Sequence, residues 1–234
     1  MSKTWESMDA RELLSAAIAE FHPRIALSTA FGVEGVVLLD MLMRIEPSAR
    51  VFTIDTGRLP AETYALMDAI RARYGCAIDV YFPSAPAVET MVCAHGVNLF
   101  YSSVERRKQC CAVRKVEPLG RALTGLQAWI TGLRRDQAVT RRDVAKVDVD
   151  RAHGGIVKLN PLADWSTDDV WRYVRAHKVP YNELHDRGYP SIGCAPCTRG
   201  VRPGEDLRAG RWWWEAAEGR ECGLHVPAAA GVPS

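Results

Sequence analysis

The sequence of 234 residues contains no apolar run long enough to cross a bilayer. Its first 21 residues lack the basic start and apolar stretch of a secretory signal, and no internal repeat is visible. With 47% hydrophobic and 25% charged residues, the composition excludes disordered and fibrous proteins. We therefore expect a soluble, cytoplasmic protein whose core needs no disulfide support.

Lysine is scarce, at 6 residues against 24 arginines, and the net charge is only +2. Residues 1–103 hold eight basic against twelve acidic residues, whereas residues 104–146 hold eleven against four. Arginine is the better planar partner for phosphate or sulfate. A compact basic patch on a nearly neutral protein favours a small anion as ligand, and neither a nucleic acid nor a membrane is expected as a partner.

Short β-branched runs alternate with amphipathic stretches through the first half of the chain. Strands are predicted at 24–27, 51–54, 77–82 and 128–131, and helices at 36–44, 60–74, 87–95 and 168–177. This alternation predicts an α/β fold with a parallel sheet covered on both faces. A short helix is predicted at 211–215. We assign residues 1–218 to one domain and the Gly-, Pro- and Ala-rich residues 219–234 to a flexible tail.

The seven cysteines are an odd number, which argues against a disulfide framework and for metal binding or catalysis. Cys110-Cys111 and the pair Cys194 and Cys197 together offer four thiolates to one metal centre. Zinc usually takes ligands spaced by two to four residues, which adjacent cysteines do not match. A 4Fe-4S cluster presents separate iron corners, so we favour it, with zinc as the alternative.

The other three cysteines lie apart from these two pairs. Cys76 precedes a predicted strand and Cys93 lies on an apolar helix, so both are interpreted as core residues. Cys222 lies in the predicted tail, where nothing would bury it. We interpret it as a nucleophile activated by nearby cations, with a chance surface cysteine as the alternative. His225 is either its assistant or a solvated tail residue.

Three loops are predicted to meet at one edge of the sheet. The loop 28–35 joins the first strand to the first helix, where backbone N–H groups favour an anion. The segments 55–58 and 132–137 end the second and fourth predicted strands, at the same carboxyl edge. The loop 28–35 lacks the lysine of a Walker loop. The convergence of the three loops predicts a nucleotide site.

Five motifs in order resemble the assimilatory adenylyl-sulfate reductase family, from residue 28 to residue 225. They are Cys-Cys-x-x-Arg-Lys at 110–115, Gly-Leu-Arg-Arg-Asp-Gln at 132–137, Gly-Cys-x-Pro-Cys-Thr-Arg at 193–199, Gly-Arg-Trp-Trp-Trp-Glu at 210–215 and Glu-Cys-Gly-Leu-His at 221–225. The resemblance implies a Rossmann-like sheet of the adenine nucleotide alpha-hydrolase type. It also implies reduction of adenosine 5′-phosphosulfate (APS) to sulfite and AMP in sulfate assimilation, with a 4Fe-4S cluster.

The resemblance further implies a role for individual residues. Cys222 attacks the sulfur, AMP leaves, and thioredoxin or a glutaredoxin-like reductant releases sulfite from the S-sulfonated enzyme. Lys115, Arg141, Arg208 and Arg211 surround the phosphosulfate. The other expected substrate-binding residues are Ser28, Thr29, Gly32, Ile54, Thr56 and Gly132. Family members are often homo-oligomers.

Other interpretations remain open. The same chemistry on 3′-phosphoadenosine 5′-phosphosulfate (PAPS) is the nearest, although family members limited to that substrate generally lack the cluster cysteines. A tRNA-thiolating enzyme would need the Ser-Gly-Gly-x-Asp-Ser loop of ATP pyrophosphatases, which residues 28–35 do not contain. A zinc-dependent nucleic-acid binding module is the third. Arg106, Arg107, Arg121 and Arg142 are interpreted as surface charges, and residues 212–214 as packing.

Overall fold

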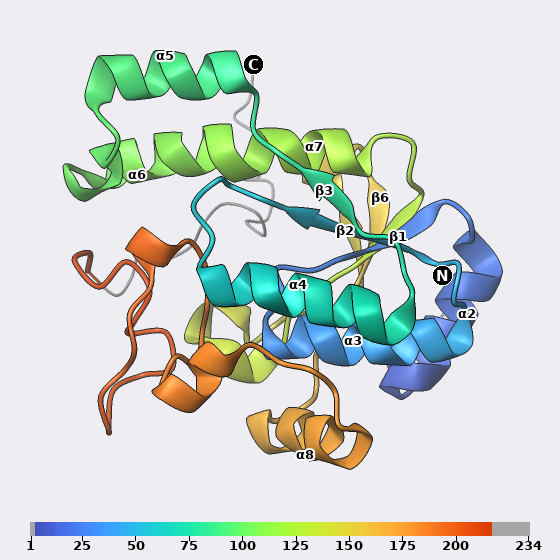
Figure 1. The fold of residues 1–234 in the computed structure, drawn as a ribbon. Helices are drawn as coiled ribbons and strands as arrows, with labels where there is room; N and C mark the ends of the chain where they lie inside the picture. The colour runs from blue at the N-terminus through green and yellow to red at the C-terminus, as the bar shows by residue number, and fades with distance from the viewer. Residues whose placement is uncertain (1–2, 217–234) are drawn as a thin grey trace.

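A six-stranded sheet forms the centre of the computed structural model, which describes residues 3–216 (Figure 1). The strand order is β3-β2-β1-β4-β6-β5. All neighbouring strands are parallel except β5, which runs antiparallel to β6 at the edge. The strands are β1 Ile25–Ser28, β2 Arg50–Ile54, β3 Asp79–Tyr81, β4 Ala128–Ile130, β5 Val147–Asp150 and β6 Ile156–Leu159.

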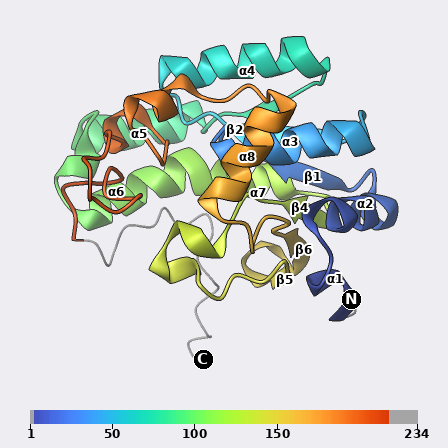
Figure 2. The ribbon, with the colours of Figure 1, turned by 90° about the horizontal axis from the view of Figure 1, so that it is seen from below.

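Helices cover both faces of the sheet, as predicted (Figure 1). One layer contains α2 Ala10–Phe21, α3 Val33–Ile45, α4 Ala61–Tyr74 and α8 Thr167–His177. The other contains α6 Val104–Cys111 and α7 Glu117–Leu123, with α5 Ala85–His95 lying over α6; the short α1 Lys3–Glu6 opens the described chain. Figure 2 shows α8 lying against α3. None of the described helices is both long and apolar enough to cross a membrane.

The two layers bury different side chains of the sheet. The larger core includes Leu27 and Ile130 with the apolar helix α3, and the smaller one packs Phe52 and Trp129 against Leu119 of α7. Because both faces are covered, the central strands β1 and β4 are buried along most of their length and are short apolar runs in the sequence. The parallel sheet had been predicted from the alternation of such strands with helices, and it is confirmed.

Most predicted elements are confirmed within one to three residues of their observed ends. The short helix predicted at 211–215 is wrong, because Arg211 pairs with Thr198 in a β-bridge and Trp212 has a left-handed φ of 44°. Cys76 is buried as predicted, but Cys93 is exposed, since α5 lies far from the sheet and buries only Met91. The predicted tail at 219–234 lies outside the described residues.

The strand order reverses beside β1. The chain leaves β1 towards β2 and β3 on one side, whereas β4 and β6 lie on the other. In open α/β sheets, ligands bind at the carboxyl ends of the strands where the order reverses in this way. The fold therefore predicts a site between the ends of β1 and β4.

Candidate active site

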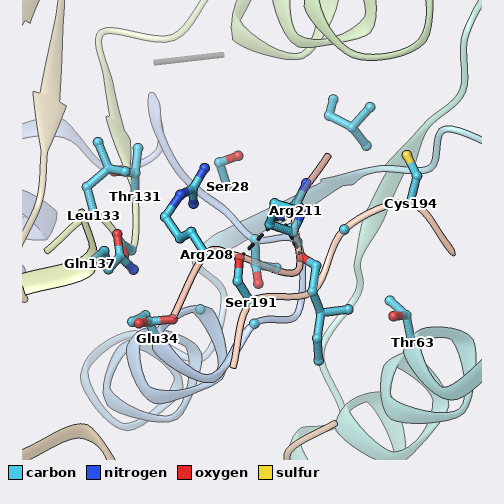
Figure 3. A pocket seen from close by; sticks show the side chains of 18 of the residues that line it. Ser28, Glu34, Thr63, Thr131, Leu133, Gln137, Ser191, Cys194, Arg208 and Arg211 are labelled. Atoms are coloured by element: carbon cyan, nitrogen blue, oxygen red, sulfur yellow. Dashed lines mark hydrogen bonds between the residues drawn. The ribbon is translucent and has the colours of Figure 1, made fainter. Parts of the chain in front are cut away.

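A cavity of about 250 Å³ opens at this reversal point (Figure 3). Its wall includes the loops that follow β1, β2 and β4, together with the segment 190–194 and the segment 207–212. Every residue predicted to bind substrate lines this one cavity: Ser28, Thr29, Gly32, Ile54, Thr56, Lys115, Gly132, Arg141, Arg208 and Arg211. The structure thus brings together side chains that lie up to 183 positions apart in the chain.

The loop after β1 is shaped by its own short contacts. The Thr29 hydroxyl accepts a hydrogen bond from the Phe31 amide at 2.9 Å, and Phe31 has a left-handed φ of 56°. Helix α3 then begins at Val33 and passes so close that a β-carbon on Gly35 would lie 3.3 Å from the Thr29 β-carbon. The amino end of a thirteen-residue helix is therefore held at the cavity, where its dipole favours an anion.

Arg211 is the most enclosed arginine that was predicted to contact the phosphosulfate. Its Nη1 lies 3.4 Å from the Ser191 hydroxyl and 3.4 Å from the Ile192 carbonyl oxygen (Figure 3). Its buried Nε finds no hydrogen-bond partner within the described part of the chain. A buried donor without a partner is costly, so this atom indicates that a ligand acceptor belongs here.

Gly193 makes the position of Arg211 possible, because an alanine β-carbon there would lie only 2.6 Å from the Arg211 Cζ. We expect Gly193→Ala to displace the guanidinium and to lower the affinity for AMP about tenfold, measured by calorimetry. Gly120→Ala is the control, since a β-carbon on Gly120 would meet nothing within 4 Å. Equal affinities for the two variants would contradict this assignment.

Lys115 connects this cavity to a second one. It lies in the π-helical turn Ala112–Val116, which follows Cys111 directly. Such turns re-aim side chains and are frequent at functional sites. Lys115 is 9% exposed and borders both cavities. It is thus one basic group shared between the predicted substrate site and the cysteines.

The second cavity is bordered by all four predicted metal-binding cysteines, Cys110, Cys111, Cys194 and Cys197. The remaining wall is strongly basic and contains Arg58, Arg107, Arg114 and Lys115. In the part of the chain that the structure describes, no three His, Cys, Asp or Glu residues are arranged to hold a metal ion. The four thiols line one cavity, and their donor chemistry fits a multi-iron cluster ligated by thiolates.

Cys110, Cys194 and Cys197 differ in how readily their thiols ionise. Burial raises the pKa of Cys110, and burial with the neighbouring Cys194 raises the pKa of Cys197 to about 12. Burial also acts to raise the pKa of Cys194, but the Lys115 ammonium and the Thr56 hydroxyl, 3.2 Å from its sulfur, outweigh it and lower the pKa. Cations beside thiols favour the thiolate form.

Known proteins resemble this chain in sequence over most of its length. Residues 24–200 match the phosphoadenosine phosphosulfate reductase domain family. The chain belongs to this family. An adenosine 5′-phosphosulfate reductase from Burkholderia cepacia is 48% identical, covering 98% of this chain and 90% of that protein. One from Allochromatium vinosum is 51% identical, covering 92% of this chain and 83% of that protein.

Solved structures agree with the family and with the fold. A Candida auris phosphoadenylyl-sulfate (PAPS) reductase, solved as a phosphate complex, is 33% identical with a TM-score of 0.72, covering 85% of this chain and 93% of that chain. A Candida glabrata FMN adenylyltransferase, at 15% identity and a TM-score of 0.57, covers 98% of this chain and 83% of that chain, and shares the fold alone.

Some residues of the reductase-family site were missed or misread. Glu34 and Arg134 line the cavity and form an ion pair at 3.0 Å; the segments 28–35 and 132–137 had been singled out, but neither residue had been named as a site residue. Arg121 and Arg142 are exposed as predicted, but Arg107 is buried, which corrects its interpretation as a surface charge. Of residues 212–214, which were predicted to be packing residues, Trp212 is buried and Trp214 packs against the same cluster, whereas Trp213 is exposed. The predicted nucleophile Cys222 lies outside the described residues, as does His225.

Proposed function

We propose that this protein reduces adenosine 5′-phosphosulfate to sulfite and AMP, with Cys222 as the nucleophile and a protein thiol such as thioredoxin as the reductant. The observation that carries the proposal is the cavity at the strand reversal, which is lined by Lys115, Arg141, Arg208 and Arg211. A nucleotide ending in a phosphosulfate needs a site with a cluster of basic side chains, and the lining of this cavity contains one.

The proposed reaction has two displacement steps. The Cys222 thiolate attacks the sulfur of the substrate, the sulfur–oxygen bond breaks, and AMP leaves with the electron pair. The substrate sulfur carries anionic oxygens, so the attack by a second anion requires cations that neutralise both partners. A thiolate of the reductant then attacks the sulfur of Cys222, and sulfite leaves with the electron pair. The second thiol of the reductant restores Cys222 and leaves the reductant as a disulfide.

The four cysteines of the second cavity are proposed to hold a 4Fe-4S cluster. When bound, the cluster supplies a fixed charged group beside Lys115, while the electrons of the reaction come from the thiol reductant. Arg58, Arg107 and Arg114 offset the negative charge of four thiolates in that cavity. Zinc remains the alternative, and metal analysis separates the two, since a colourless protein containing zinc would contradict the cluster.

The proposed substrate is the nucleotide without a 3′-phosphate. Relatives that carry the name adenosine 5′-phosphosulfate reductase are 45–51% identical over most of this chain, against 33% for the PAPS reductase structure. The four cysteines also favour APS, because family members limited to PAPS generally lack them. Comparing sulfite release from APS and PAPS tests this choice, and a clear preference for PAPS would overturn it.

The experiment that tests the proposed function is mass spectrometry of the protein after mixing with APS in the absence of any reductant. We expect one sulfonate adduct, which peptide mapping assigns to Cys222, and its loss with release of sulfite when thioredoxin is added. An adduct on Cys76 or Cys93 would mean that the nucleophile is wrong. The absence of any adduct, with AMP still bound, would contradict the covalent route.

A further inference from the structure

A buried ion pair joins the helix of the first two cluster cysteines to the C-terminal end of the described chain. Arg107 of α6 donates from Nε to Glu215 Oε1 at 2.9 Å and from Nη2 to Glu215 Oε2 at 2.7 Å. The two side chains are 1% and 3% exposed. A bidentate pair fixes the relative orientation of the two side chains as well as the distance between them, because both hydrogen bonds must align.

Trp212 strengthens the same connection. Its ring centroid lies 4.8 Å from the guanidinium carbon of Arg107 and 4.7 Å from that of Arg211. Its φ of 44° is rare for a residue with a bulky side chain, so the surroundings must hold the backbone in place. The Trp212 amide also donates to the Cys197 carbonyl at 3.3 Å. We call Arg107, Trp212 and Glu215 the C-terminal anchor.

The C-terminal anchor is connected to the cysteines of α6, to the nucleotide cavity and, along the chain, to Cys222. Arg107 is one helical turn before Cys111, and Arg211 next to Trp212 lines the nucleotide cavity. Cys222 follows Glu215 by seven residues, so an extended chain of at most about 25 Å separates them. The position of Glu215 therefore limits the region of space that the Cys222 thiol can reach.

We infer that the C-terminal anchor is a positioning device, in which Arg107 and Glu215 hold the chain so that Cys222 reaches the substrate sulfur. This inference rests on the proposed function, in which Cys222 is the nucleophile. Glu215 lies outside the cavity lining and does not contact substrate in this scheme. Its loss should therefore slow the attack by Cys222 more than it weakens nucleotide binding.

Glu215→Gln tests the inference, because it keeps the shape of the side chain and removes the charge. We expect the single-turnover rate of Cys222 sulfonation at saturating APS to fall at least tenfold, with AMP affinity changed less than twofold. Glu215→Asp, which retains the charge but shortens the side chain, should give an intermediate rate. Glu205→Gln is the matched control, since Arg199 and Glu205 form a bidentate but partly exposed pair in the same region.

A second measurement reports on the anchor itself. Arg211 is 7% exposed, so tryptic cleavage after it requires local opening of the segment. We expect this cleavage to be about tenfold faster in Glu215→Gln than in the wild type or in Glu205→Gln.

The outcomes are separable. Sulfonation at the wild-type rate in Glu215→Gln, or a parallel loss of AMP binding, would overturn the positioning role. If the wild type formed no adduct on Cys222, the proposed function would fail, and unchanged cleavage after Arg211 would then overturn the anchor as well.

Discussion

Replacing Cys222 with serine is expected to reduce sulfite release from APS by about 10⁴-fold or more, the range seen when an enzyme loses its nucleophile. Serine differs from cysteine by one atom, but its hydroxyl does not ionise near neutral pH and is a far weaker nucleophile than a thiolate. Nucleotide binding should remain, because every lining residue in the described part of the chain precedes Cys222. The measurement is sulfite release with saturating thioredoxin, beside AMP affinity by calorimetry.

Cys93→Ser is the control for this prediction. Cys93 is exposed and lies on α5, where it borders neither cavity. We expect this variant to keep the wild-type rate within twofold. Substantial sulfite release by Cys222→Ser, or an equal loss in Cys93→Ser, would show that Cys222 is not the attacking group.

The position of the site could be predicted because it depends on the order of the strands more than on any long-range contact. Ser28 ends β1, and Thr56 and Gly132 follow β2 and β4; the sequence marks each of these strands by a short apolar run. In a parallel sheet those ends meet at one edge, so residues far apart in the chain are brought together by topology. Lys115 and Arg211 follow no strand, so this argument did not apply to them. They were predicted only from their motifs.

The burial of Arg107 and of Cys93 was predicted wrongly because it depends on long-range packing. Arg107 occurs in the run Arg106-Arg107-Lys108, which is typical of a solvated helix face, and its partner Glu215 is 108 positions away. A local pattern cannot reveal that one member of such a run is buried against a distant carboxylate. The prediction that Cys93 is a core residue was wrong because its apolar helix α5 packs against the π-helical turn Ala112–Val116 rather than on the sheet. Long-range packing decided both positions.

Lys115 differs from the other predicted phosphosulfate contacts because it borders both cavities. Its charge lowers the pKa of Cys194 on one side, and on the other it faces the space assigned to the substrate. A buried ammonium in a water-poor site acts strongly on nearby anions, since solvent screens it little. Removal of the Lys115 charge should therefore hinder the approach of a thiolate to a sulfur that carries anionic oxygens more than it affects folding.

Lys115→Met is accordingly expected to lower kcat/KM for APS by about 10²- to 10³-fold, the usual cost of removing one preorganised charge. Methionine retains the apolar part of the lysine side chain, so the packing of a residue that is 9% exposed is largely kept. Lys108→Met, on the exposed side of α6, is the matched control and should change kcat/KM less than twofold. The two variants are compared by steady-state sulfite release and by AMP affinity. Similar values of kcat/KM for both would mean that the charge at position 115 does not act on the reacting atoms.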